Sequence, residues 1–371
     1  MVNYMSKKNE FYTTLKGIAI LLVIIGHATT LNMFNNIDSY PYNNLAVEAT
    51  KIFNNIQAAI YGFHMPLFMA ITGGIFAISF NNNSTNSYKF LAKKIKRLIV
   101  PYLLIGIFLL IPIRFFVGYY ENANIFKVIL NDIILSLDCN FLWFILADFE
   151  ITIICYFLWK KIKDKNIKTH LIVEFIFLFL SVVFVSKLKD LPFQISRTMQ
   201  YLPWFFLGTI VQNYFVNIKE KFFDKKELWI FIISLILYTL TFFIYQYLLN
   251  IVDNNASDHM MIIKTIKMAF YYMMAFLGTL MCYSIGFLIK LKFINFFGNK
   301  SFYFYVIHSV LMLIYCKITY LIIKPEKMNN IIYCIAIIGN ILCLIIFSCL
   351  IIAMLDAIKK IVKRKECYNG K

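Results

Sequence analysis

Ten long apolar segments limit what this chain can fold into more than any other feature of its sequence. Each is long and apolar enough for a helix to cross the hydrocarbon core of a bilayer, which takes roughly 20 residues. Hydrophobic residues make up 61% of the 371 residues, and no soluble core hides that much apolar surface. We therefore predict an all-α, polytopic membrane protein with about ten transmembrane helices. The predicted spans are residues 15–32, 58–80, 98–118, 140–159, 171–186, 200–217, 228–250, 264–289, 301–323 and 331–355.

The distribution of lysine and arginine predicts how these helices are oriented. The two tails and the even-numbered gaps between spans hold 25 of the 37 basic residues, and the side rich in Lys and Arg is normally cytoplasmic. Both termini are therefore expected in the cytoplasm, with the protein in a bacterial plasma membrane. The net charge of +18 then reflects topology and attraction to membrane lipids. Nucleic-acid binding is not expected, because the basic residues are scattered over short pieces.

The chain is predicted to form a single membrane-embedded domain over residues 1–371. Its helical core spans residues 15–355, and residues 356–371 form a basic cytoplasmic tail. The longest gap, residues 32–57, is expected to be an Asn-rich outer loop. Six of the eight cysteines lie in predicted helices and show no paired metal spacing. We expect these cysteines to pack as small apolar residues, and we expect no bound metal.

A histidine inside the first span is the strongest indication of chemistry. A titratable side chain at this depth is costly unless it faces a cavity, a partner or a substrate. Lys16 precedes His27 by eleven residues. Three helical turns plus about 20° place the two residues on one face, about 16 Å apart along the axis. His27 could instead hydrogen-bond a neighbouring helix, but the face that it shares with Lys16 favours a reaction centre within the membrane.

Two further histidines are candidates for the same site. His64 opens the second span, where Pro66 removes a backbone donor and favours an irregular helix start. Helix rise places His27 and His64 in the outer half of the membrane, where we expect them to lie close together. His308 lies about 10 Å into its span from Ser301. Both residues also have structural explanations, His64 at the headgroup interface and His308 in helix–helix hydrogen bonding.

The basic run before the third span contains a candidate phosphate-binding residue. Most of its lysines are explained by ordinary cytoplasmic charge. Arg97 lies at the membrane edge just before Pro101, and a guanidinium group binds phosphate in a planar fork. Arg114, at the opposite end of the third span, is expected to extend outward to the lipid headgroups.

Acidic residues in the fourth span are predicted to act separately. Asp148 and Glu150 are two residues apart, about 200° around a helix, so they cannot work as a pair. One of them is expected to neutralise a cation from another helix, and the sequence does not say which. Trp143 shares a face with Glu150, because seven residues separate them. The role of Glu174 in the next span is equally open.

Several short motifs occur in one order over nearly the whole chain. They are Lys16–Ile20 with Gly26–His27, Phe63–Phe68 with Gly73–Gly74, Lys94–Arg97 before Pro101–Tyr102, Leu142–Phe144, Phe205–Gly208, and Gly298–Ser301 with Tyr305 and His308. No single motif is specific, but the first-helix pattern and the His-Met-Pro-Leu-Phe string together are fairly strong. On these motifs the sequence resembles the acyltransferase 3 family of integral membrane acyltransferases. It is most similar to the branch called fucose 4-O-acetylase-like.

The resemblance implies about ten helices and transfer of an acyl group, usually acetyl from cytoplasmic acetyl-CoA, to an extracytoplasmic acceptor. The acceptor is commonly a hydroxyl of a cell-surface glycan. The family's basic residue eleven before the histidine corresponds to Lys16, where many members have Arg, and its loop arginine pair corresponds to Lys94 and Arg97. A lysine keeps the charge but loses bidentate binding of phosphate. Some members carry a fused soluble domain, and we expect any such function here to come from a separate extracytoplasmic partner.

The residues and the resemblance together predict a membrane O-acyltransferase. Lys16, Lys94 and Arg97 are expected near the phosphates of acetyl-CoA, the acyl donor. His27 is expected to act as general base on the acceptor hydroxyl or to carry the acyl group itself, and His64 to orient His27 or bind the acceptor. The candidates for substrate contact or support are Trp143, Glu150, Tyr305 and His308. The alternative is a transporter or flippase of a glycan or lipid-linked sugar, since ten helices with scattered buried charges fit that function equally well.

Overall fold

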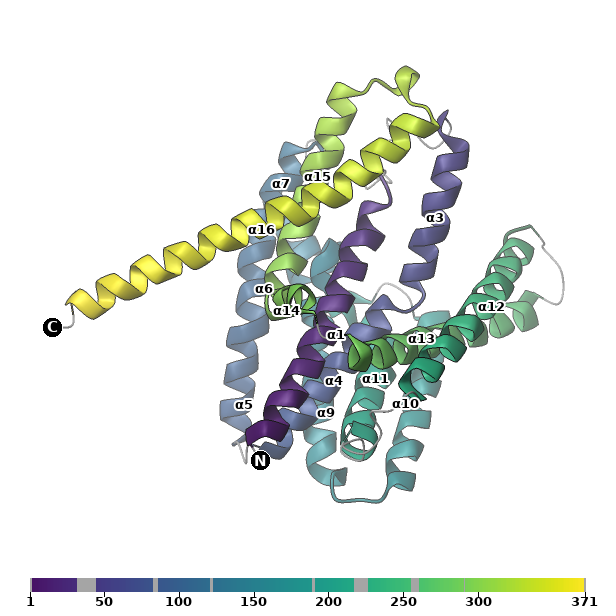
Figure 1. Ribbon diagram of the computed structural model, residues 1–371, viewed down its shortest axis with the longest axis vertical. Helices are drawn as coiled ribbons and strands as arrows, with labels where there is room; N and C mark the ends of the chain where they lie inside the picture. The colour runs from purple at the N-terminus through teal and green to yellow at the C-terminus, as the bar shows by residue number, and fades with distance from the viewer. Residues whose placement is uncertain are drawn as a thin grey trace.

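Helices form nearly all of the regular structure of the computed structural model, which describes residues 2–31, 45–82, 86–120, 123–188, 191–216, 226–254, 260–289 and 291–369 (Figure 1). No strand occurs in these ranges, so the all-α class predicted from the sequence is confirmed. The α-helices are α1 (Val2–Ala28), α3 (Val47–Tyr61), α4 (His64–Asn82), α5 (Ser87–Lys94), α6 (Val100–Ile105), α7 (Ile111–Phe116), α8 (Ile125–Val128), α9 (Trp143–Ile162), α10 (Ile167–Lys187), α11 (Ile195–Ile210), α12 (Lys226–Asn254), α13 (Met260–Leu288), α14 (Lys292–Asn299), α15 (Ser301–Ile322) and α16 (Asn330–Asn369).

All ten predicted spans fall on helices, and the protein is a multi-pass membrane protein. Among the described residues, eight helical stretches are long and apolar enough to cross a membrane. The two predicted spans outside this set are α9 and α11. Helix α9 carries two acids and two lysines, and α11 has only 16 residues. A π-helical stretch, Val211–Val216, directly continues α11 and lengthens it.

The outer loop predicted for residues 32–57 is wrong in its second half. Residues 47–61 form helix α3, whereas residues 32–44 lie outside the described part of the chain. Only Gly62 and Phe63 separate α3 from α4. This break confirms the irregular helix start predicted near His64. Figure 1 shows α3 beside the beginning of α16, with which it is in contact.

The third membrane-crossing stretch, Ser87–Phe116, begins earlier than the predicted span 98–118. It consists of α5, α6 and α7, joined by π-helical turns at Ile95–Ile99 and Gly106–Leu110. Each π turn is followed within two residues by a proline, Pro101 or Pro112. Proline has no backbone N–H to donate and its ring crowds the preceding turn, so a locally widened helix is the expected response. The first of these turns contains Arg97.

The final helix is longer than predicted. Helix α16 continues to Asn369, so it includes most of residues 356–371, which were predicted as a basic cytoplasmic tail. Its far end projects away from the bundle in Figure 1. An ion pair between Lys300 and Asp356, at 2.6 Å, ties α16 to the start of α15.

Helices α4 and α11 pack closely because glycines line their contact. A Cβ added at Gly73 would come within 1.9 Å of the carbonyl oxygen of Phe205, and one added at Gly208 within 2.0 Å of that of Ala70. Neither position has room for a side chain. Small residues at helix contacts are what allows backbones to approach this closely within a membrane.

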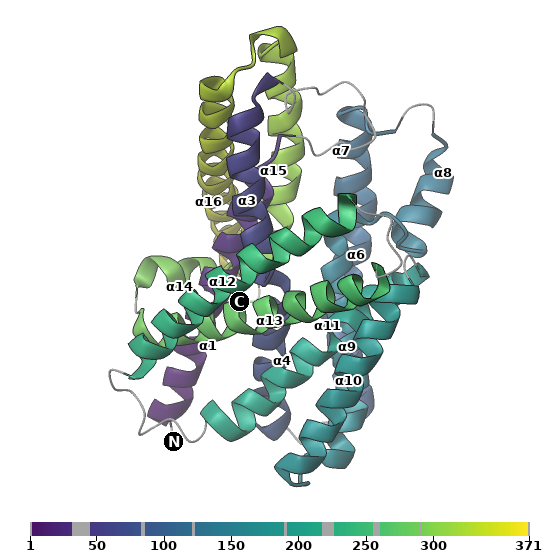
Figure 2. The ribbon, with the colours of Figure 1, turned by 90° about the vertical axis from the view of Figure 1, so that its right-hand side faces the viewer.

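Helix α1 runs through the middle of the molecule (Figures 1 and 2). It contacts α3, α4, α13, α14, α15 and α16, and its residues Leu15, Ala19, Ile20 and Ile24 are fully buried. Helices α12 and α13 pack along each other and run at a steep angle to α15 in both views. We call the end with α5 and the α9–α10 turn the inner end. The charge distribution predicts that this end is cytoplasmic. The end with the α15–α16 turn is called the outer end.

Candidate active site

Three histidines from three helices meet toward the outer end. His27 lies in the last turn of α1, His64 begins α4, and His308 lies in α15. The ring centroid of His27 is 6.4 Å from that of His64 and 5.4 Å from that of His308. The predicted proximity of His27 and His64 is confirmed, and the structure adds His308. These three residues are called the histidine cluster.

The three rings differ in their exposure. His64 and His308 are buried, with 4% and 0% of their surface exposed, whereas His27 is partly exposed. Nδ1 of His64 lies 3.0 Å from the carbonyl oxygen of Ile60, and Nδ1 of His308 lies 2.9 Å from that of Phe304. A carbonyl oxygen can only accept, so each of these Nδ1 atoms carries a proton. His27 is therefore the most exposed member of the cluster.

His308 also presents an acceptor atom toward the interior. With the proton on Nδ1, its Nε2 is an acceptor when the ring is neutral. That atom is buried and makes no hydrogen bond with any other described residue. Buried polar atoms of this kind are rare, and each calls for a functional or structural explanation.

A tyrosine that the sequence analysis did not single out holds His27. The phenol oxygen of Tyr61, the last residue of α3, lies 2.9 Å from Nδ1 of His27. Its ring centroid is 4.8 Å from that of His64. Tyr61 lies within the predicted span 58–80, where only His64 was predicted as a candidate. Its position three residues before His64, close to one helical turn, was the available signal.

Two side-chain amides fix the end of α1 that carries His27. Nε2 of Gln57 donates to the carbonyl oxygen of Gly26 at 3.3 Å, and Nδ2 of Asn340 donates to that of Ala28 at 3.2 Å. The last carbonyl groups of a helix have no backbone partner within it. The carbonyl oxygen of Gly26 also accepts from Oγ1 of Thr29 at 2.8 Å, so both carbonyl groups are satisfied by side chains. His27 is thereby held in place from both α3 and α16.

A group of cations lies further along α1, toward the inner end. Lys16 and Arg97 are close enough to interact electrostatically, as are Lys94 and Arg97. Lys16 and Lys94 are partly buried, and Arg97 is exposed. Asp148, on α9, is buried and interacts with both Lys94 and Arg97. Lys16, Lys94 and Arg97 are called the basic cluster.

The two acids of α9 have different surroundings, as their spacing predicted. Asp148 is the one that offsets cations, which the sequence left undecided. Glu150 accepts a hydrogen bond from Oγ1 of Thr198 at 2.7 Å. Glu174, on α10, is buried, and its Oε2 has no hydrogen bond with any other described residue. Neither Glu150 nor Glu174 has a contact with the histidine cluster among the described interactions.

Of the two aromatic candidates, Tyr305 adjoins the histidine cluster, whereas the contacts described for Trp143 are with other residues. The hydroxyl of Tyr305 donates to the carbonyl oxygen of Phe141, and its ring centroid is 6.1 Å from that of His308. Trp143 stacks on Tyr201 at 5.2 Å between centroids. The guanidinium of Arg197 lies over the Trp143 ring, 4.7 Å from its centroid.

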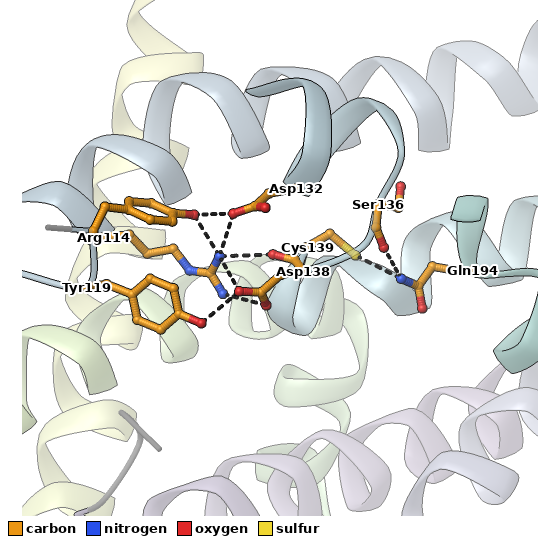
Figure 3. Close-up of polar contacts among 8 residues, drawn as sticks. Arg114, Tyr119, Asp132, Ser136, Asp138, Cys139 and Gln194 are labelled. Atoms are coloured by element: carbon orange, nitrogen blue, oxygen red, sulfur yellow. Dashed lines mark hydrogen bonds and ion pairs between the residues drawn. The ribbon is translucent and has the colours of Figure 1, made fainter. Parts of the chain in front are cut away.

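The prediction that Arg114 extends to the headgroups is wrong. Its side chain is 2% exposed and pairs with Asp132 at 3.3 Å and with Asp138 at 3.1 Å (Figure 3). The hydroxyl of Tyr119 donates to Asp138 at 2.7 Å, and that of Tyr120 donates to Asp132. Burial raises the pKa of Tyr119 to about 12, so its phenol stays protonated at neutral pH. Both carboxylates come from the gap between two spans, where Arg114 finds charge partners that outweigh exposure to lipid headgroups.

These features define a polytopic helical membrane protein whose central helix joins a basic cluster to a histidine cluster. Among the described residues, no group of three or more His, Cys, Asp and Glu has the geometry to hold a metal ion.

A family model described as an acyltransferase domain matches residues 9–349, nearly the whole chain. The chain belongs to this family, acyltransferase 3, and is a membrane acyltransferase. Comparison with curated proteins and with solved structures finds no match. The fucose 4-O-acetylase-like branch stays a prediction.

Proposed function

We propose that the protein moves an acyl group, acetyl in the first instance, from cytoplasmic acyl-CoA to a hydroxyl of an extracytoplasmic glycan in a bacterial plasma membrane. One observation carries the proposal. Helix α1 presents Lys16 to the basic cluster and His27 to the histidine cluster. A donor and an acceptor that arrive from opposite sides of a membrane need one site with two ends, one end for each substrate.

The basic cluster is suited to the phosphates of the donor. Arg97 offers a planar fork for a phosphate group, and Lys16 and Lys94 add two point charges. Asp148 offsets part of this charge and faces Lys94 and Arg97, so it orients these side chains when no anion is bound. The residues present therefore fit a polyphosphate ligand.

The length of α1 constrains the shape of the donor. Lys16 and His27 are about 16 Å apart along the helix axis. A donor that engages both ends must carry its phosphates and its reactive group on a long flexible arm. Acyl-CoA has this form, with a pantetheine arm between the phosphates and the thioester.

His27 is the proposed base. When Nδ1 carries the proton and donates it to Tyr61, Nε2 is free to accept the proton of the acceptor hydroxyl. The acceptor oxygen then bonds to the thioester carbonyl, the C–S bond breaks, and the leaving CoA thiolate takes the proton from His27. In the covalent alternative, Nε2 of His27 first bonds to the acyl carbon and the hydroxyl attacks in a second step.

The surroundings of His27 favour the neutral ring that either route needs. None of the three histidine rings has a hydrogen bond to a carboxylate among the described residues. A carboxylate partner would stabilise the charged imidazolium, which can neither accept a proton nor attack a thioester. His64 and His308 are proposed to orient His27 and to contact the acceptor hydroxyl.

Acetyl transfer across a membrane tests this proposal directly. Purified protein is reconstituted into liposomes, labelled acetyl-CoA is supplied on one side, and a cell-wall glycan is enclosed on the other. We expect labelled acetyl groups on the glycan only where the basic cluster faces the acetyl-CoA. Movement of the glycan with no acetylation would instead show a transporter.

A further inference from the structure

A cavity of about 230 Å³ lies beside the candidate active site, near the outer ends of α10 and α11. Its lining residues are Ser136, Leu137, Phe184, Val185, Leu191, Gln194, Ser196, Arg197 and Gln200. None of these residues belongs to the basic cluster or the histidine cluster. The cavity is called the outer pocket.

The outer pocket contains two polar side chains that are free to bind a ligand. Arg197 and Gln200 are three residues apart on α11, so they are neighbours on its surface. Within the described part of the chain, Arg197 has no ion-pair partner and neither side chain has a hydrogen bond. The Trp143 ring supports the guanidinium from one side. The nearby acids Asp132 and Asp138 are already paired with Arg114.

The walls of the outer pocket are fastened to each other. The side chain of Gln194 donates to the carbonyl oxygen of Ser136, and the backbone N–H of Phe193 donates to that of Leu135 at 2.8 Å. Ser136, Phe193 and Gln194 all have positive φ, between 56° and 59°, which non-glycine residues rarely adopt. Such backbone persists only where its surroundings hold it. The pocket is therefore preformed, as small-ligand sites usually are.

Short contacts join the outer pocket to the histidine cluster. Gln194 lies 3.5 Å from Sγ of Cys139, and two residues further along, the ring of Phe141 is 6.5 Å from that of His308 between centroids. Arg197 also interacts electrostatically with Tyr305, which adjoins His308. Cys139, Phe141 and Tyr305 therefore connect the pocket to His308.

We propose that the outer pocket is an acceptor subsite for an anionic sugar unit, whose carboxylate or phosphate binds Arg197 and whose hydroxyls bind Gln200. This inference rests on the proposed function. The cavity is smaller than the roughly 300–1,000 Å³ of sites for drug-sized ligands, which suits one monosaccharide. A guanidinium group with no carboxylate partner favours an anion over a neutral sugar. A neighbouring unit of the same glycan then presents its hydroxyl toward His27.

Binding measurements test the subsite without relying on transfer. The wild-type protein in nanodiscs of neutral lipid is titrated with a uronic-acid disaccharide and with its neutral counterpart. We expect the acidic sugar to bind at least about tenfold more tightly, since a charge-assisted hydrogen bond contributes that much. Arg197→Gln should abolish the preference, and Arg197→Lys should keep part of it. Lys127→Gln removes an exposed charge from helix α8 and should leave both affinities unchanged.

Equal binding of the two sugars by the wild type, or a preference that survives in Arg197→Gln, would overturn the subsite. A nanodisc series with increasing phosphatidylglycerol adds a second arm. Loss of sugar binding in that series would show that a lipid headgroup occupies the pocket. The acetyl transfer assay separates the two proposals. Intact binding of the acidic sugar without any acetyl transfer would contradict the proposed acyltransferase function but would support the sugar-binding site.

Discussion

The phenol oxygen of Tyr61 lies 2.9 Å from Nδ1 of His27, joining the end of α3 to the last turn of α1. This contact leaves Nε2 as the atom of His27 available for chemistry. It also sets the orientation of a ring that is otherwise only partly enclosed. Tyr61 is thus a positioning residue for the proposed base.

Removing the phenol oxygen of Tyr61 should slow transfer without weakening donor binding. We expect Tyr61→Phe to lower kcat about tenfold, the effect of one hydrogen bond of about 1.4 kcal/mol, with KM for acetyl-CoA unchanged. Tyr315→Phe is the matched control, because its hydroxyl donates to the carbonyl oxygen of Ala336, away from the site, at 2.9 Å. A rise in KM with unchanged kcat would assign Tyr61 to substrate binding instead.

Lys16 should contribute to recognition of the donor phosphates. We expect Lys16→Met to raise KM for acetyl-CoA about tenfold and to leave KM for acetyl-pantetheine, which has no nucleotide phosphates, unchanged. Lys16→Arg should lower KM for acetyl-CoA, because a guanidinium adds a second parallel hydrogen bond. Steady-state kinetics with the two donors decide the matter. Equal effects on both would place Lys16 outside phosphate recognition.

The buried Arg114 should be a strong determinant of stability. Arg114→Met leaves Asp132 and Asp138 without their cation and should lower the free energy of unfolding by about 3 kcal/mol. The triple variant that also carries Asp132→Asn and Asp138→Asn should recover most of this loss, since it leaves no unpaired charge. Thermal unfolding in detergent measures both. An Arg114→Met protein as stable as the wild type would contradict the ion-pair network.

The tight contact between α4 and α11 predicts a specific packing defect. Gly73→Ala places a methyl group against backbone and should cost about 1–3 kcal/mol. Gly339→Ala on α16 is the milder comparison, because the nearest atom there is the phenol oxygen of Tyr315, which can move at no more than the cost of its hydrogen bond to Ala336. The difference between their unfolding temperatures is the measured quantity. Equal temperatures would mean that α4 and α11 can move apart at no cost.

Helix geometry made part of this site predictable from sequence. Periodicity placed Lys16 and His27 on one face, and helix rise placed His64 near His27. The opposite faces of Asp148 and Glu150 followed from the same 100° rotation. These relationships depend on one or two helices of known direction, so a single sequence contains them.

Contacts that depend on packing between distant segments were not predictable. Polar residues such as Asn54, Asn55 and Gln57 made residues 47–57 look like a loop, so the helix that positions Tyr61 beside His27 was not predicted. Arg114 was expected to face headgroups because its two carboxylates lie in a gap with no regular pattern. The inclusion of His308 in the cluster depends on how α15 packs against α1, which no periodicity reveals.

The central claim, that His27 is the base, is tested most directly by His27→Gln. Acetyl transfer at saturating substrates is compared with acetyl-CoA binding on the same preparation. We predict that transfer falls by about 10³-fold while binding is unchanged. His170→Gln is the control, because His170 is a histidine outside the site that hydrogen-bonds Tyr214 and the carbonyl oxygen of Ile162. A folded His27→Gln protein that transfers acetyl at the wild-type rate would contradict the account.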